Sequence, residues 1–253
     1  MSNIVLGSDG IAIRQGIYEE SSVLKTDLGR FIDFQDGRRF RYCEDGGSGI
    51  TKGHLVCPAA VVANDNTVTQ TGMTVTISGG HIGAKVINVL LGAATTANLY
   101  AGGFFVVEGG TGLGQCHRIR KNKAGGASVE SPCEVTLYDP LVVALDATSI
   151  ISLTQNKYKD VRVAPATTVT SPIIGVPLIT VTASYYFWCQ TRGYAPVVVD
   201  DDGALTVGMG VASGGGDPGA AIIEAAGLLS HRIGIAVQVA AQDTYATVDL
   251  MCE

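Results

Sequence analysis

The 253-residue sequence has little charge, and the charge that it has is not basic. Lys, Arg, Asp and Glu make up 16% of the residues, and the formal net charge is −6. A protein that follows a nucleic-acid backbone needs an excess of basic residues. We therefore expect no direct contact with nucleic acid.

The sequence also lacks long stretches with the 3.6-residue period of an amphipathic helix. Segments rich in Thr, Val and Ile recur between Gly, Pro and Asp residues, and glycine alone accounts for 33 positions. Short strands separated by turns are typical of this pattern. The sequence predicts an all-β fold with little helix, built as two compact antiparallel units of barrel or sandwich type.

No segment has the features of a membrane span or a secretion signal. The uncharged stretches 86–107 and 163–191 are 22 and 29 residues long, but the first contains Asn and Gly residues and the second contains three prolines. Such residues suit buried strands better than a lone helix in lipid. The apolar run near the start is too short for a signal-peptide core. We expect synthesis in the cytoplasm and no contact with a membrane.

Motifs for catalysis and metal binding are missing as well. The six cysteines include no CxxC pair, and the four histidines include no HxH or HExxH pair, which argues against a zinc site. We expect most cysteines to be buried thiols. A disulfide bond is an alternative if the protein ends up outside a cell. No GxSxG nucleophile motif is present. The sequence predicts no catalytic residue and no cofactor.

The glycine-rich stretch EGGTGLGQC resembles a phosphate-binding loop only in part. Gly109 and Gly114 have the spacing of a P-loop, but Gln115 and Cys116 follow where Lys and Ser or Thr would be needed. The flanking segments alternate like strands. The pattern predicts a structural turn between two strands.

Three consecutive aspartates, Asp200–Asp202, raise the alternative of a calcium site. Neighbouring carboxylates at the end of a strand point in alternating directions, and the spacing of a calcium-binding loop is absent. The pair Asp202-Gly203 favours a hairpin turn at this place.

A second hairpin is predicted in GRFIDFQDGRRFRYC. Asp36-Gly37 separates two alternating segments, which is typical of a two-residue type I′ turn. In the second segment Arg39 and Arg41 share one face, opposite the aromatic residues. Acidic residues surround the arginines, so we predict a solvated face or a contact with a protein partner, rather than a contact with nucleic acid.

Residues 1–27, which we call the arm, contain too few apolar residues to form a core. We predict an extended segment in which Ile11, Ile13 and Ile17 anchor to a partner. Two β domains are predicted to follow, at 28–160 and 161–253, and we expect them to fold without the arm.

The densest aromatic cluster, YYFWCQTRGYAP, predicts a strand that is buried on both faces. Tyr186 and Trp188 fall on one face, together with Gln190 and Arg192. An ordinary core strand and a carbohydrate platform are alternatives. We favour an interface with a second subunit for this face, because aromatic residues and arginine are enriched at interface centres.

Taken in order, these motifs resemble the capsid decoration (cement) proteins of tailed bacteriophages. The opening LGRFIDFQDGRRFRYCEDGGSGITKGHLV is similar to the start of that family, and GQCHRIRKN, TLYDPL, QNKYKDV, YYFWCQTRG and RIGIAV follow in the family's order across residues 28–253. The resemblance implies a non-enzymatic virion protein, made in the host cytoplasm and located on the capsid surface. It implies the major capsid protein as partner, and self-association, most often as a homotrimer.

Two other classes of function compete with this interpretation. The first is a carbohydrate-binding β protein, such as a tail-associated receptor binder. The second, less favoured, is a glycan hydrolase. It stays an alternative because a pair of catalytic carboxylates leaves no local signature in a sequence. The sequence singles out no such pair.

Overall fold

The chain divides into two units, and the segment that forms the second is inserted within the first. In the computed structural model, unit 1 comprises Met1–Ala60 and Lys157–Glu253, and unit 2 comprises Val61–Asn156. Within these units the structure describes residues 5–6, 10, 12–59, 68–69, 80–126, 128, 130–166, 171–201, 203–224 and 232–253. The predicted boundary at 160 lies close to the return of the chain to unit 1. Its departure near residue 60 was not predicted.

The fold is all-β: the regular secondary structure of the described residues consists of strands alone. The strands of unit 1 are β1 (Val5–Leu6), β2 (Ala12–Ile13), β3 (Phe31–Asp33), β4 (Arg39–Glu44), β5 (Val56–Cys57), β12 (Arg162–Val163), β13 (Val176–Pro177), β14 (Tyr186–Val198), β15 (Gly210–Ser213), β16 (Ala221–Ile223), β17 (Arg232–Ala236) and β18 (Tyr245–Met251). Those of unit 2 are β6 (Val68–Thr69), β7 (Val86–Val89), β8 (Phe104–Gly109), β9 (Cys116–Asn122), β10 (Cys133–Leu137) and β11 (Ile150–Thr154). The described part of the chain holds no helix with the length and apolarity that a membrane crossing needs.

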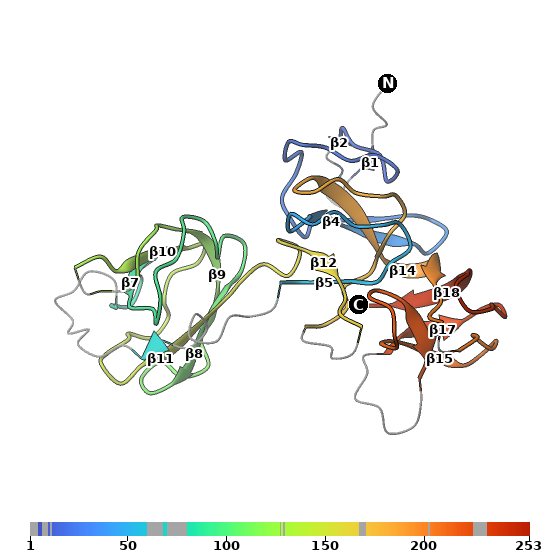
Figure 1. Cartoon of the computed structure of the whole chain (residues 1–253). Coiled ribbons are helices and arrows are strands. Elements are labelled where there is room, and N and C mark those ends of the chain that lie inside the picture. The colour runs from blue at the N-terminus through green and yellow to red at the C-terminus, as the bar shows by residue number, and fades with distance from the viewer. Residues whose placement is uncertain are drawn as a thin grey trace. The chain divides into compact units, whose positions relative to one another are not determined.

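Strand β14 organises unit 1. Its first half pairs with β4 and its second half with β18, both antiparallel, and β13 pairs with it near Gln190. The resulting sheet has the order β16-β15-β17-β18-β14-β4-β3, in which β4 and β14 lie side by side (Figure 1). One sheet therefore contains strands from both of the predicted β domains. Alternation shows which residues of a strand face a core, but it does not name the strand's partner.

The hairpin predicted at Asp36-Gly37 is present, with a longer loop than the sequence suggested. Strands β3 and β4 pair antiparallel, and the Phe34 amide donates a 2.9 Å hydrogen bond to the Arg38 carbonyl. Three residues therefore form the loop. Gly37 has φ +88°, whereas Asp36 is not among the residues with positive φ. A type I′ turn needs positive φ at both central residues, so the predicted turn type is wrong.

The described part of the arm packs on the rest of unit 1. The backbones of Ser21 and Tyr186 exchange hydrogen bonds of 3.0 and 2.8 Å, and the Glu20 carboxylate accepts a 2.6 Å bond from the Thr182 amide. Ile13 and Ile17 are buried. These residues belong to the core of unit 1, whereas Ile11 lies outside the described residues.

The strands of unit 2 curl around a separate core (Figure 1). The sheet order is β6-β11-β8-β9-β10-β7. In β7, β8 and β10 alternate residues are buried. In these three strands the intervening residues are exposed or half-buried. Ile87, Phe105, Ile119, Val135 and Ile151 come from five different strands and are fully buried.

Candidate functional site

The residues predicted to form an interface gather around β4 and β14 in unit 1. Across these strands Trp188 opposes Tyr42, and Arg192 opposes Arg39. The structure therefore brings together residues that are about 150 positions apart in the sequence. The described members of the set are Ile13, Ile17, Arg39, Arg41, Tyr186, Trp188, Gln190 and Arg192.

Trp188 lies in the core of unit 1 and is fully buried. Its indole Nε1 donates a 3.0 Å hydrogen bond to the carbonyl of Gln15 in the arm. The side chain of Gln15 accepts a 2.7 Å bond from the Tyr42 hydroxyl and donates a 2.9 Å bond to the Tyr186 carbonyl. Residues 187–191 of the strand are buried on both faces, as predicted, but the segment that covers Trp188 is the chain's own arm. No sequence motif pointed to Gln15.

The other three predicted residues of β14 differ in exposure. Tyr186 is half-buried, and its hydroxyl donates a 3.2 Å bond to Glu44. Gln190 is fully buried and donates to the carbonyls of Arg192 and Tyr194 at 3.0 and 2.9 Å. The side chain of Arg192 is exposed. Of these residues, Arg192 is the one that offers a charge to a partner.

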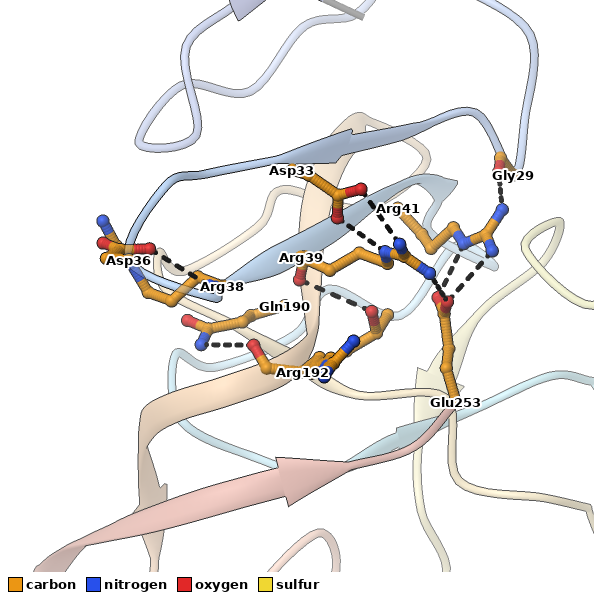
Figure 2. A network of polar contacts seen from close by, with 10 residues as sticks. Gly29, Asp33, Asp36, Arg38, Arg39, Arg41, Gln190, Arg192 and Glu253 are labelled. Atoms are coloured by element: carbon orange, nitrogen blue, oxygen red, sulfur yellow. Dashed lines mark hydrogen bonds and ion pairs between the residues drawn. The ribbon is translucent and has the colours of Figure 1, made fainter. Parts of the chain in front are cut away.

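The arginines of β4 form a network with two carboxylates (Figure 2). Arg39 binds Asp33 through two hydrogen bonds of 2.6 and 2.9 Å, and it reaches Glu253 at 3.0 Å. Arg41 binds Glu253 through bonds of 2.6 and 3.0 Å and also donates to the Gly29 carbonyl at 2.7 Å. Paired, planar contacts of this kind are geometrically specific. Both arginines therefore bind residues of their own chain and stabilise the sheet.

The network holds Glu253 in its charged form. Partial burial raises the pKa of this carboxyl, but hydrogen bonds from Arg41 and Arg39 outweigh burial and lower the pKa to about 2. Because the folded-state pKa lies below that of an exposed glutamate, the interaction stabilises the folded state above pH 4–5, roughly the unfolded pKa. The stabilisation is lost as the pH falls towards 2.

We expect the stability difference between wild type and Glu253→Gln to depend on pH. It is largest above pH 5, about 1 kcal/mol because solvent screens the partly exposed carboxylate, and shrinks as the pH approaches 2. Urea unfolding followed by the fluorescence of Trp188, the single tryptophan, measures it. Glu224→Gln, which breaks the more exposed pair with Arg232, serves as control and should change little. A difference that is constant with pH would contradict the network's role.

An open groove of about 1020 Å³ borders this network. Its lining combines the hairpin loop with the neighbouring parts of β14 and β18, namely Asp36, Gly37, Arg38, Arg192, Gly193, Tyr194, Asp249, Leu250, Met251 and Glu253. Asp36 and Glu253 are already paired with arginines. Tyr194 and Met251 are 60% and 49% exposed. The groove thus offers apolar contact beside Arg192, a combination suited to a protein surface.

A carboxylate cluster lies elsewhere in unit 1. Oxygens of Asp200, Asp201 and Asp217 lie within 4.8 Å of one another, and such a set could supply ligands to a divalent cation. Asp200 is buried, and it accepts hydrogen bonds from the amides of Gly216 and Asp217 at 3.2 and 2.9 Å. Its carboxylate therefore shapes the loop at 214–217. Asp202, in the predicted hairpin turn, lies outside the described residues.

Gln115, a buried side chain that the sequence did not single out, helps to hold the glycine loop of unit 2. Gln115 accepts bonds from the amides of Val142 and Val143 at 3.0 and 3.1 Å, and it donates to the carbonyls of Val143 and Gly112 at 3.0 and 3.3 Å. The loop thus connects β8 and β9 and is tied to a second loop.

We expect Gly112→Ala to destabilise unit 2 more than Gly114→Ala. Both glycines have left-handed φ, +85° and +88°, which costs any other residue about 1–2 kcal/mol. A Cβ at Gly112 would also lie 2.6 Å from Gln115 Nε2 and 2.8 Å from Leu145, whereas one at Gly114 meets nothing within 4 Å. Urea unfolding by circular dichroism compares them. Equal losses would mean that the Gln115 contact is unimportant, and saturable binding of ATP or NAD to wild type would contradict a purely structural loop.

In comparisons with known proteins, no family model, no curated protein and no solved structure matched the chain. The structure shows in which strands the motifs of the resemblance lie. DGRRFRY ends in β4, and nearly all of YYFWCQTRG and RIGIAV lies in β14 and β17 of the same sheet. GQCHRIRKN lies in β9, and TLYDPL begins in β10.

Proposed function

We propose that the protein is a capsid decoration protein, a non-enzymatic virion component that binds the outside of the assembled head and clamps neighbouring major capsid subunits. The observation that carries the proposal is the convergence of the family-like motifs. Residues 39–42 of DGRRFRY pair with Trp188, Cys189, Gln190 and Arg192 of YYFWCQTRG, with a register shift after Gln190, although the whole of unit 2 separates the two segments in the sequence.

A clamp needs a body that keeps its shape under load. In unit 1, β14 is bonded on both sides, the arm covers Trp188, and the arginine network joins β3 and β4 to Glu253. A protein that binds only the assembled state stabilises that state by mass action. A braced β body with exposed contact surfaces meets this requirement without a catalytic group.

The proposal includes self-association, as a homotrimer. In a ring of identical subunits the same patches meet around one axis. Arg192, Tyr194 and Met251 form the exposed part of the candidate site, and they are the residues that we assign to such a contact or to the capsid. Light scattering at two protein concentrations distinguishes a trimer from a monomer.

The function is tested by sedimentation with heads from which the protein has been removed. We expect saturable binding to assembled heads at a fixed ratio to the major capsid protein, and no binding to unassembled capsid subunits. Failure to bind heads would contradict the proposal. Binding to a glycan array without head binding would favour the carbohydrate-binding alternative.

A further inference from the structure

The five lysines and arginines of unit 2 gather on and beside strand β9. Arg118, Arg120 and Lys121 lie on the strand, and Lys123 follows it. Lys85 is adjacent, because its Nζ donates a 2.9 Å bond to the carbonyl of Tyr138, whose amide is bonded to β9. All five residues are exposed. Unit 2 also has six Asp and Glu, so its net charge of −1 conceals the local concentration of positive charge.

A bulge in the strand pairing places consecutive cations towards solvent. On β10, Leu137 opposes Ile119, and the next residue back, Thr136, opposes Lys121. Arg120 is therefore the extra residue of β9. Because of this shift, Arg120 and Lys121 are both exposed, where strict alternation would bury one of them. Bulges commonly redirect side chains in this way.

Two exposed aromatic residues flank the first of these cations. Phe104 on β8 opposes Arg118 and is 48% exposed, and Tyr138 is 43% exposed. The guanidinium carbon of Arg118 lies 5.0 Å from the centre of the Tyr138 ring. The cation is thus held in place before any partner arrives, which reduces the entropy lost on binding.

We propose that the surface formed by Phe104, Arg118, Arg120, Lys121 and Tyr138, the β9 face, docks the protein onto an acidic protein surface of the assembled head. The inference rests on the proposed function and names the surface that performs it. Arginine and aromatic residues at the centre match the composition of protein interface cores. Positive charge at the edge attracts an acidic partner and orients its approach.

The same observations favour a protein partner over a nucleic acid. Lys123 is paired with Glu134 at 2.9 Å, and Lys85 is bonded to a backbone carbonyl. On the strand itself, Arg118 contacts the Tyr138 ring. Arg120 and Lys121 have no partner in the described structure. A phosphate-binding track needs a broader basic excess.

The test is a charge reversal, Arg120→Glu with Lys121→Glu, assayed by sedimentation with stripped heads. A matched control reverses Lys25 and Lys52, two exposed lysines of unit 1. We expect the β9-face variant to bind heads about tenfold more weakly or worse, and the control to bind within about twofold of wild type. Both should melt close to wild type, because none of the four side chains supports the fold. Phe104→Ala should also weaken binding without a change in charge.

The outcomes separate this inference from the proposed function. If wild type does not bind heads, the proposed function fails, and the inference fails with it. If wild type binds and the β9-face variant binds equally well, the inference alone is overturned. The inference is also overturned if wild type binds a fluorescent oligothymidylate saturably and the reversal abolishes that binding while head binding is unchanged, because the β9 face would then serve a nucleic acid.

Discussion

Trp188→Ala is expected to lower the free energy of unfolding of unit 1 by about 3–5 kcal/mol, the usual loss when a buried tryptophan is truncated. The side chain is fully buried, its ring centre lies 4.9 Å from that of Tyr42, and its Nε1 satisfies the Gln15 carbonyl. The variant therefore leaves both a cavity and a buried carbonyl without its donor. Urea unfolding followed by far-ultraviolet circular dichroism measures the loss.

The control for this variant is Tyr194→Ala on the same strand. Tyr194 is 60% exposed and should change the unfolding free energy by about 0.5 kcal/mol or less. Trp188→Phe should fall between the two, because it keeps an aromatic ring and removes the donor. A loss under about 1 kcal/mol for Trp188→Ala would contradict its place in the core and return it to the surface role that the sequence predicted.

Removal of the arm is the second change with a large expected effect. A chain that begins at Leu28 loses two buried isoleucines, Ile13 and Ile17, and the hydrogen bonds of Gln15 to β4 and β14. We expect its melting temperature to fall by about 10 °C or more, because burial of each isoleucine is worth about 1.5–3 kcal/mol. We also expect the emission of Trp188 to shift to longer wavelength, since the arm no longer covers the indole.

Val23→Ser with Leu24→Ser is the matched control for the arm. These two residues belong to the same segment but are 59% and 49% exposed, so their replacement should leave the melting temperature and the emission nearly unchanged. If the shortened chain melts within a few degrees of the full chain with unchanged emission, the segment is a detachable arm, as the sequence suggested.

Local features of the fold were predictable because local chemistry determines them. The Asp36-Gly37 loop, the alternation of β9 and the doubly buried aromatic strand all follow from patterns within a few residues. The turn type at Gly37 was wrong because a three-residue loop with one left-handed glycine uses the same dipeptide as a type I′ turn. The fold class follows from many such patterns together.

The long-range contacts of the site could not be predicted. Gln15 and Trp188 are 173 positions apart, and Arg41 and Glu253 are 212 positions apart. Neither Gln15 nor Glu253 belongs to a motif, so no sequence signal connects them to their partners. The bulge at Arg120 was invisible for a related reason, because it is a property of the pairing between two strands and not of either strand alone.

We propose that the protein lies on the outside of the assembled head. Quantitative mass spectrometry of purified, intact virions tests it most directly, with a brief protease treatment of the same particles to report on exposure. We expect the protein to be present at a fixed, high ratio to the major capsid protein and to be accessible to protease while the packaged genome stays protected. Its absence from intact virions, or its presence only in trace or tail-associated amounts, would rule out a place on the head surface.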